Sequence, residues 1–477
     1  MEVKMKSLSL LTDLYEYSMA NGFEQNLVND QAVFDVFFRK VPDDGSFVIV
    51  AGLQQVVEQL VQLHFNDSDI SYFKGLNLFD SKFLNMLQNF EFECRINAVP
   101  EGTPIFPREP LLTIEGPLIQ AQMVETLVLN ILNHQSLIAT KSRRINFAAQ
   151  GRPVMEFGAR RAQGPDSAIF GARAAVIGGC SSTSNVYAAK QFNIPAAGTM
   201  AHSWIEAFDS ELESFQQWAR IYPENTALLV DTYNVLESGV PNAIKVFKEL
   251  KGEGHAPIGI RIDSGDIGYL TKAARKMLDD AGFYDAKITV SNALDERVIT
   301  SLLQEGAPID NFGVGEKLIT SASSPVLSGV YKLAAIERNG KVIPKLKVSG
   351  SREKVTLPGI KKIYRLYKIG SAQSFADLIA LNYEEIGGEP LSVIDSDPLS
   401  VGKMHVLRGY RAEELLKEIN LTHFRSNDVF KIKDYCQTEI GKLPDETKRL
   451  TNPNRYTVYM TEKLANLQQR LLKKSAN

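Results

Sequence analysis

The sequence predicts an α/β protein built as an irregular, TIM-like α/β barrel with an additional α+β domain, and three patterns along the chain support this fold class. Residues 126–335 alternate short apolar runs with segments of helical periodicity, the pattern of a parallel sheet. Residues 1–125 mix alternating and helical runs, as in an α+β domain. Beyond this barrel, residues 336–477 begin with runs typical of antiparallel strands. We expect this last segment to return in part to the amino-terminal domain and to end in surface helices.

The amino-terminal segment contains two strand-like runs, "AVFDVFFRKV" at 32–41 and "FVIVAG" at 47–52. Residues 53–65, "LQQVVEQLVQLHF", have helical periodicity. Residues 97–117 are punctuated by proline and glycine, which is typical of a small β unit.

The barrel segment is predicted from eight apolar runs, each followed by a helical pattern or a turn. About seven or eight such units would close or nearly close a barrel. The runs are "PVMEFGA" (153–159), "AAVIGG" (174–179), "IPAAGT" (194–199), "ALLVD" (227–231), "PIGIRID" (257–263), "KITVS" (287–291), "NFGVG" (311–315) and "VYKLAAIE" (330–337).

The carboxyl-terminal segment opens with two runs, at 339–350 and 363–370, that are typical of antiparallel strands. We expect these strands to pair with the amino-terminal domain. Residues 461–474 have apolar residues at helical spacing and end in lysines, as expected of a surface helix with cations at its carboxyl end.

Composition excludes several classes of protein. The 477 residues include 44% hydrophobic and 23% charged residues with a net charge of -3, so no overall positive field indicates nucleic-acid binding. Cys94, Cys180 and Cys436 are far apart, which argues against a disulfide framework or structural zinc. No leader peptide or membrane span is predicted. We expect a cytoplasmic protein.

Polar residues and glycines follow most of the barrel runs. The active sites of α/β barrels lie at the carboxyl ends of the strands, so this clustering marks a candidate active site. The residues are Arg160, Arg161, Ser181, Thr199, His202, Asp231, Asp263, Asp266, Ser291 and Lys317.

These residue types suit a phosphorylated sugar, a second anion and a reactive histidine. The loops after residues 291 and 315 offer backbone N–H groups to a phosphate. Asp263 and Asp266 supply the oxygen ligands that Mg²⁺ or sugar hydroxyls prefer. Arg160 and its neighbour suit a carboxylate or polyphosphate. His202, with Asp231 at the end of the next run as a partner, suits a base or nucleophile.

Each residue also has a purely structural interpretation. A single histidine is more often a satisfied structural residue, "GGCSSTSN" (178–185) suits a helix cap, and "DSGD" (263–266) suits an Asx-turn. Neither GxxxxGK[ST] nor GxGxxG occurs. The clustering of several weak signals at one end of the predicted barrel favours the functional interpretation.

Seven segments resemble the nicotinate phosphoribosyltransferase family, in the order found there. The resemblance extends from about residue 8 to the end of the chain. It rests on "LLTDLYEYSMANGF" (10–23), "EFGARRAQGPDSA" (156–168), "GGCSSTSNVYAA" (178–189), "GTMAHSW" (198–204), "LLVDTYNV" (228–235), "IRIDSGD" (260–266) and "NFGVGEKL" (311–318). It implies a barrel beside an α+β domain, transfer of the phosphoribosyl group of phosphoribosyl pyrophosphate to nicotinate, and ATP and Mg²⁺ as co-substrate and cofactor.

The resemblance implies a role for His202, as the histidine that ATP phosphorylates, with Asp231 orienting it. Tyr15 matches an aromatic residue that stacks on the pyridine ring from the neighbouring subunit of a homodimer. Phe157 would form the other face of that sandwich.

The remaining matches concern the substrates. Arg160 matches a ligand-contacting arginine, Arg261 and Asp263 match the ribose region, and Gly313 and Gly315 match the phosphate-binding turn. Thr199 and Ser291, at the ends of their runs, complete the predicted substrate contacts. Mg²⁺ is expected on the departing pyrophosphate, with Asp263 and Asp266 as its protein contacts.

Ser181 bears on the choice of base. Related enzymes that use nicotinamide have an aspartate near this position, which would repel a carboxylate. The neutral "GGCSSTSN" therefore favours nicotinate, and nicotinamide phosphoribosyltransferase is the alternative. One departure is Gly350-Ser351, where Glu-Asn is expected in many members, although Lys354 and the following "PG" are retained.

Two hypotheses from other classes remain. Lys317 at a strand end suits a Schiff base, as in barrel aldolases. A ligand sensor that retains the fold without the activity is the non-enzymatic alternative, and the intact His202, Asp231, Arg160 and Asp263 argue against it.

Overall fold

The computed structural model describes residues 7–351, 354–387, 390–397, 400, 402–421, 424 and 427–476. Residues 1–6, on which the prediction of no leader peptide rests in part, lie outside the described residues, as do residues 352 and 353, which follow the Gly350-Ser351 departure.

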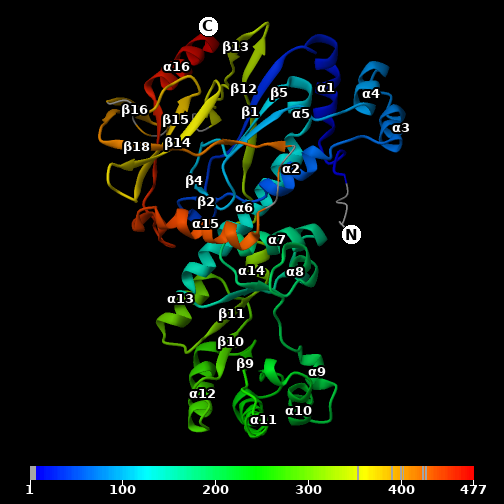
Figure 1. The fold of residues 1–477 in the computed structure, drawn as a ribbon, viewed down its shortest axis with the longest axis vertical. Coiled ribbons are helices and arrows are strands. Elements are labelled where there is room, and N and C mark those ends of the chain that lie inside the picture. The colour runs from blue at the N-terminus through cyan, green and yellow to red at the C-terminus, as the bar shows by residue number, and fades with distance from the viewer. Residues whose placement is uncertain are drawn as a thin grey trace. The chain divides into compact units, whose positions relative to one another are not determined.

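The chain forms two compact units, and most of their elements are labelled in Figure 1. Unit 1 comprises residues 1–137, 326–427 and 434–477, and unit 2 comprises residues 138–325 and 428–433. The sequence prediction places the corresponding boundaries after residues 125 and 335.

Unit 1 contains two six-stranded sheets among its described residues. The first has the order β13-β12-β1-β5-β3-β19, and the second β17-β16-β20-β15-β14-β18. The strands of the first sheet are β1 (Gln31–Phe38), β3 (Arg95–Ala98), β5 (Leu112–Pro117), β12 (Gly329–Arg338), β13 (Lys341–Pro344) and β19 (Lys417–Glu418). Those of the second are β14 (Lys361–Lys368), β15 (Ser374–Leu381), β16 (Leu391–Asp395), β17 (Met404–Leu407), β18 (Tyr410–Glu414) and β20 (Thr457–Thr461). The short strands β2 (Val48–Ile49) and β4 (Pro104–Ile105) pair with each other.

The helices of unit 1 include those predicted for residues 53–65 and 461–474. They are α1 (Leu14–Asn26), α2 (Leu53–Val61), α3 (Asp67–Gly75), α4 (Ser81–Gln88), α5 (Leu118–Met123) and α16 (Glu462–Ala476), with α6 (Glu125–Ala148) and α15 (Val429–Gly441) crossing the unit boundaries. Lys473 and Lys474 lie in the last turn of α16, where cations interact favourably with the helix dipole.

The run at 330–337 does not form a barrel strand, so this part of the prediction is wrong. It forms β12, which pairs antiparallel with β1 in the first sheet of unit 1. Phe34 of β1 stacks on Tyr331 of β12 with ring centroids 4.7 Å apart. An apolar run of this length fits a buried parallel or antiparallel strand equally well, and its pairing partner decides.

Only one of the two later runs joins the sheet that contains the amino-terminal strands, and it does so through β12. Residues 341–344 form β13, which pairs with β12. Residues 361–368 form β14, which pairs with β15 and β18 in the second sheet of the same unit.

Unit 2 is built around a parallel sheet with the order β7-β6-β11-β10-β9-β8. The strands are β6 (Val154–Glu156), β7 (Ser182–Thr183), β8 (Ala227–Leu229), β9 (Gly259–Ile262), β10 (Lys287–Val290) and β11 (Asn311–Val314). The helices are α7 (Pro165–Ile177), α8 (Val186–Phe192), α9 (His202–Glu206), α10 (Glu211–Ile221), α11 (Val240–Gly252), α12 (Ile267–Asp280), α13 (Glu296–Gln304) and α14 (Glu316–Ile319).

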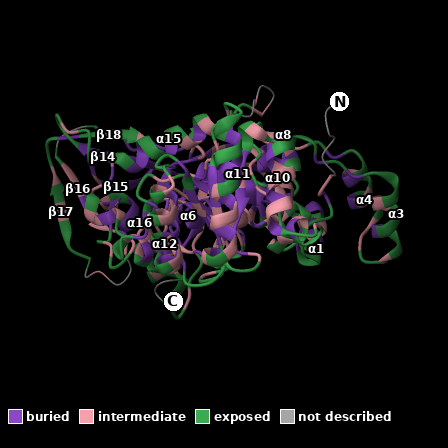
Figure 2. Ribbon diagram, turned by 90° about the horizontal axis from the view of Figure 1, so that it is seen from below, coloured by how far each residue is buried: buried purple, intermediate pink, exposed green. Residues whose placement is uncertain are grey.

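Several helices of unit 2, among them α11, bury one apolar face. In α11 the buried face consists of Val240, Ala243, Val246, Phe247 and Leu250. Figure 2 shows the same division into buried and exposed faces on α10 and α11. The alternation of strands and helices confirms the predicted α/β fold class.

Two predicted barrel strands are replaced by other structure. "AAVIGG" is the end of α7, because the alanine-rich run continues the helix that begins at Pro165. A Cβ on Gly178 would lie 2.2 Å from the carbonyl oxygen of Ala139, so the helix ends where only glycine fits. "IPAAGT" contributes a single parallel bridge from Ala196 to Thr183. The sheet is therefore a partial barrel of six strands and one bridge among the described residues.

No helix in the described part of the chain is both long and apolar enough to cross a membrane. The cysteines Cys94, Cys180 and Cys436 are buried and free.

Candidate active site

The carboxyl ends of the parallel strands of unit 2 bring most of the predicted site residues to one edge of the sheet. Val290 is paired with Ile262 and with Phe312, and Val314 is paired with Glu156. The residues that follow these strands therefore start from the same edge, as expected for the active-site end of a barrel.

Arg261 connects three of the predicted residues. Its guanidinium donates to Ser291 Oγ at 2.9 Å, to Thr199 Oγ1 at 3.0 Å and to Asp263 Oδ1 at 3.1 Å. Ser291 Oγ also donates to Asp263 Oδ1. Charge-assisted bonds of this kind fix the orientation of each partner. The arrangement leaves the residues at the ends of β9 and β10 as one preorganised polar cluster.

His202 is the first residue of α9, directly after the irregular segment that follows the bridge at Ala196. Its imidazole is 41% exposed, Nδ1 lies 3.0 Å from Thr232 Oγ1, and Nε2 lies 4.0 Å from Asp263 Oδ2. The two ring nitrogens are thus flanked by a hydroxyl and a carboxylate. Either tautomer finds a partner while the ring stays accessible.

Asp231, which was expected to orient His202, is buried, and its hydrogen bonds go to the loop after β9. Its Oδ2 accepts from the backbone N–H of Asp263 at 2.9 Å and from Ser264 Oγ at 2.7 Å. Among the described residues, its Oδ1 is buried without a hydrogen-bond partner. Asp231 therefore holds the loop after β9, and the neighbouring Thr232, which sequence reasoning missed, contacts the histidine.

Phe157 lies against Gly313, which is in β11, and against Gly315, which follows this strand. A Cβ added to Gly313 would lie 2.6 Å from Cδ2 of Phe157, and a Cβ added to Gly315 would lie 3.1 Å from its carbonyl oxygen. The guanidinium of Arg261 lies 5.7 Å from the centroid of the Phe157 ring. Gly313 thus provides the space for the aromatic ring, which places this predicted base-binding residue beside the Arg261 cluster.

The arginines after β6 lie on a short 3-10 turn, Ala159–Arg161, and are exposed. Arg161 Nε lies 3.5 Å from Glu316 Oε2, with both side chains more than half exposed. Such exposed pairs contribute little to stability. Arg160 is exposed and bears its charge near the end of β6.

Glu156 supports this turn and was not singled out from the sequence. Its carboxylate is fully buried, accepts a hydrogen bond from the Gly158 N–H, and accepts from Thr183 Oγ1 at 2.6 Å. Burial raises the pKa of Glu156, although these two hydrogen bonds act in the opposite direction. The residue ties the end of β6 to β7. Its position immediately before Phe157 is the only signal that the sequence offered.

Ser181 is at the other end of its strand, which corrects its predicted position. Because "AAVIG" is helical, the strand is Ser182–Thr183 and Ser181 precedes it. Ser181 Oγ donates to the Val154 carbonyl at the start of β6, at 3.1 Å. The hydroxyl is thus engaged by the backbone and is not presented at the carboxyl edge.

Asp266 is exposed and caps α12, where its Oδ1 accepts from the Tyr269 N–H at 3.0 Å. Asp263 uses its Oδ1 for Arg261 and Ser291. Across the described residues there is no group of three or more His, Cys, Asp or Glu side chains arranged to hold a metal ion. Any Mg²⁺ here would take most of its ligands from a phosphate substrate and water, which is common for this ion.

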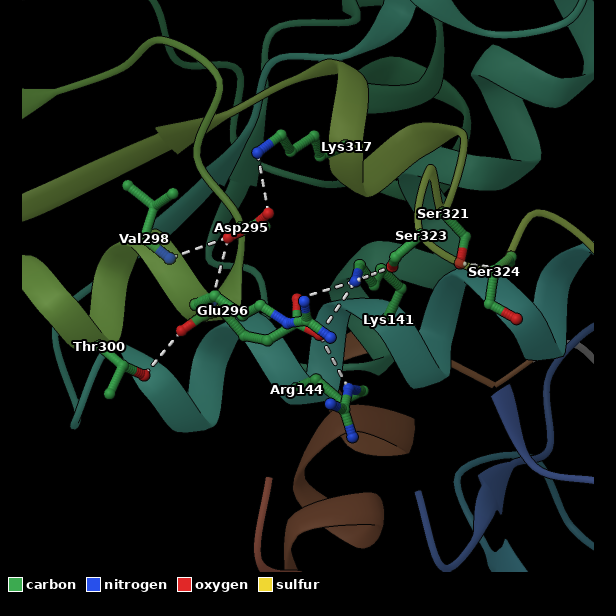
Figure 3. A network of polar contacts seen from close by, with 11 residues as sticks. Lys141, Arg144, Asp295, Glu296, Val298, Thr300, Lys317, Ser321, Ser323 and Ser324 are labelled. Atoms are coloured by element: carbon green, nitrogen blue, oxygen red, sulfur yellow. Dashed lines mark hydrogen bonds and ion pairs between the residues drawn. The ribbon is translucent and has the colours of Figure 1, made fainter. Parts of the chain in front are cut away.

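Lys317 is held by a carboxylate that sequence reasoning did not single out (Figure 3). Its Nζ donates to Asp295 Oδ2 at 2.8 Å. Asp295 also caps α13 by accepting from the N–H groups of Arg297 and Val298. Two N–H groups in the first turn of α13 are therefore already bonded to the Asp295 side chain. The residue before α14 is Gly315, which has no side chain to cap the N–H groups of that helix.

Tyr15 lies in unit 1, in the first turn of α1, and is 47% exposed. Burial raises the pKa of its hydroxyl to about 12, with the carboxylates of Glu125, Glu16 and Asp13 acting in the same direction. The ring is accessible to a ligand or a partner, and the hydroxyl stays neutral at physiological pH.

Comparison with known proteins identifies relatives along almost the whole chain. Three family models match: the nicotinate phosphoribosyltransferase (NAPRTase) N-terminal domain at residues 10–133, the nicotinate phosphoribosyltransferase (NAPRTase) family at 153–352, and the nicotinate phosphoribosyltransferase C-terminal domain at 360–468.

Individual relatives agree with these matches. Nicotinate phosphoribosyltransferase of Bacillus subtilis is 41% identical over 463 residues, which cover 96% of this chain and 94% of the relative. The human protein of the same name is 30% identical over 528 residues, covering 97% and 96%. The crystal structure of human nicotinic acid phosphoribosyltransferase superposes with a TM-score of 0.84 at 28% identity, covering 97% of this chain and all of that one.

Proposed function

Because the chain belongs to the nicotinate phosphoribosyltransferase family and is an enzyme of that activity, we propose that it couples the transfer to ATP hydrolysis through a phosphate carried on His202. In the transfer, the ring nitrogen of nicotinate attacks C1 of phosphoribosyl pyrophosphate. The C1–O bond to pyrophosphate breaks, and pyrophosphate leaves with the bonding electrons.

The observation that carries the phosphohistidine proposal is the environment of the imidazole. His202 is accessible, and Thr232 and Asp263 flank its two nitrogens. A nucleophilic nitrogen needs a free lone pair while the other nitrogen keeps the proton. One ring nitrogen attacks the terminal phosphorus of ATP and ADP leaves. Water later cleaves the phosphorus–nitrogen bond, which restores the imidazole and releases phosphate.

We assign binding roles by the chemistry of each position. Arg160, exposed and cationic, suits the carboxylate of nicotinate. Phe157 would stack on the pyridine ring, with Tyr15 of a partner subunit on the opposite face, so the working enzyme would be a homodimer. Gly313 and Gly315 would contribute backbone N–H groups to the 5-phosphate. Thr199, Ser291 and Arg261 would form the ribose side of the site.

Mg²⁺ would enter with pyrophosphate and neutralise the charge that develops on this leaving group. Asp263 is the residue best placed to contact it, because its second carboxylate oxygen lies on the side of His202. Asp266 has one oxygen engaged in capping α12 and would contribute the other. We place the reaction in the cytoplasm, where buried free cysteines remain reduced.

The test is mononucleotide formation from phosphoribosyl pyrophosphate and Mg²⁺, with nicotinate or nicotinamide, each with and without ATP. We expect product from nicotinate, stimulated by ATP. His202→Ala should abolish ATP hydrolysis and the acid-labile phosphoprotein formed from γ-labelled ATP, while slow ATP-independent synthesis persists.

His255→Ala is the matched control. His255 Nδ1 lies 2.6 Å from Glu224 Oε1, and this pair is not part of the cluster described above. It should leave both activities unchanged. Undiminished ATP hydrolysis by His202→Ala would remove this histidine from the coupling.

A further inference from the structure

The loop after β10 contains an unusual backbone conformation. Asn292 has φ 92° and Ala293 has φ 44°, so two consecutive residues with side chains occupy the left-handed region. Such conformations are unfavourable for residues with side chains and persist only where the surrounding structure imposes them. The loop starts at Ser291, which the Arg261 cluster fixes, and a second constraint is needed at its other end.

Asp295 supplies that second constraint. One carboxylate oxygen accepts from the N–H groups of Arg297 and Val298, and the other accepts from Lys317 Nζ at 2.8 Å. Lys317 belongs to α14, directly after the glycine turn that ends at Gly315. The ion pair thus joins the loop after β10 to the turn after β11.

The next residue, Glu296, attaches the same segment to α6 (Figure 3). Its buried carboxylate lies 2.8 Å from Lys141 Nζ and 3.0 Å from Arg144 Nε, both on α6. Lys141 also donates to Ser323 Oγ at 2.7 Å. The segment that follows the glycine turn is therefore attached at residue 317 and again at residue 323.

The electrostatics agree with this geometry. Burial raises the pKa of Asp295, but the hydrogen bond and charge of Lys317 and the helix N–H groups outweigh it and hold the pKa below its usual value. Asp295 is therefore ionised at neutral pH. The Nζ of Lys317 is engaged by this carboxylate and is not free for the Schiff-base chemistry considered from the sequence.

We propose that Asp295 and Lys317 are a positioning pair for phosphoribosyl pyrophosphate: their ion pair holds the Asn292–Ala293 loop and the Gly313–Gly315 turn in the spacing that binds this substrate. The inference rests on the proposed binding of the phosphoribosyl group by Ser291, at the start of that loop, and by Gly313 and Gly315. Neither side chain needs to touch the substrate.

Lys317→Met and Asp295→Asn test the proposal. Methionine keeps most of the volume of the lysine stem without its charge, and asparagine keeps the oxygen that caps α13. Each variant should raise KM for phosphoribosyl pyrophosphate about tenfold, equivalent to about 1.4 kcal/mol, and leave KM for nicotinate unchanged. The double variant should be no worse than either single variant, because both remove the same interaction. Lys317→Arg should recover most of the affinity.

Lys276→Met is the control, since it removes an exposed ion pair with Asp280 on α12. It should leave both constants unchanged. An unaltered KM for phosphoribosyl pyrophosphate in Lys317→Met would overturn the proposal, as would a parallel rise in both KM values with a lowered Tm, which would indicate a general structural role. If the wild-type enzyme formed no product from phosphoribosyl pyrophosphate, the proposed function itself would be refuted.

Discussion

Replacing Gly313 by alanine is expected to displace the ring of Phe157 and weaken nicotinate binding. A Cβ at this position would lie 2.6 Å from Cδ2 and 2.7 Å from Cε2 of the ring. Non-bonded carbon atoms lie about 3.5–4.0 Å apart, so one of the two groups must move by about 1 Å. Gly313 is in β11 and paired with Met155 of β6, so the ring moves rather than the strand.

The magnitude follows from what the ring contributes. A well-placed aromatic stack adds about 0.5–1.5 kcal/mol beyond the burial of its area. Loss of about 1 kcal/mol corresponds to a roughly fivefold rise in KM for nicotinate. Because the backbone at Gly313 does not have a positive φ, alanine adds no conformational strain of its own.

Steady-state kinetics with each substrate varied in turn would measure this effect. Gly75→Ala is the control, since a Cβ there has nothing within 4 Å, and it should behave as wild type. Phe157→Leu in the Gly313→Ala background should relieve the clash. The loss of nicotinate binding free energy in the double variant should therefore be smaller than the sum of the losses in the two single variants. A normal KM for nicotinate in Gly313→Ala would refute this account of the glycine.

Three further outcomes are expected. Ser181→Ala should leave the ratio of kcat/KM for nicotinate and nicotinamide unchanged, because its hydroxyl is bonded to the Val154 carbonyl; a shifted ratio would restore its predicted role in specificity. Tyr15→Ala should raise KM for nicotinate by about fivefold, equivalent to about 1 kcal/mol; if sites are shared between subunits, a hybrid dimer with His202→Ala should contain one intact site and recover ATP-stimulated synthesis at the wild-type KM for nicotinate. Asp295 has a lowered pKa in the folded state, so the stability it contributes is present above about pH 4 and is lost as the pH falls through its folded pKa. Acid unfolding curves of wild type and Lys317→Met should therefore differ above about pH 4 and converge below it.

The sequence was most informative where its periodicity was unambiguous. The runs at residues 257–263, 287–291 and 311–315 form parallel strands, and the polar residues that follow them lie at one edge of the sheet. The strand prediction for "AAVIGG" was wrong because a short apolar run of small residues suits a buried helix end as well as a strand. That single error also placed Ser181 at the wrong end of β7.

The individual pairings in the site could not be predicted, because they depend on side-chain direction and not on strand order. Asp231 and Thr232 are adjacent after β8, yet the carboxylate turns to the loop after β9 while the hydroxyl meets His202. Order along the chain brings both residues to the correct edge. Only the conformation of the turn decides which of them contacts the imidazole.

The network below the site shows why such pairings matter for function. Lys141 and Glu296 are 155 positions apart, and nothing in either local sequence connects them. Both are almost completely buried, and because an unpaired buried charge is costly, their ion pair is needed to keep both charges in place. This ion pair fixes the position of residue 296. The adjacent Asp295 is thereby also held in place, and its ion pair with Lys317 fixes the position of the glycine turn. A motif search detects the glycines that would face the phosphate, whereas the constraint that keeps them in place comes from residues in α6 that carry no motif. Substitutions at Lys141 should therefore affect substrate binding as well as stability, even though this lysine lies outside the segments by which the family is recognised.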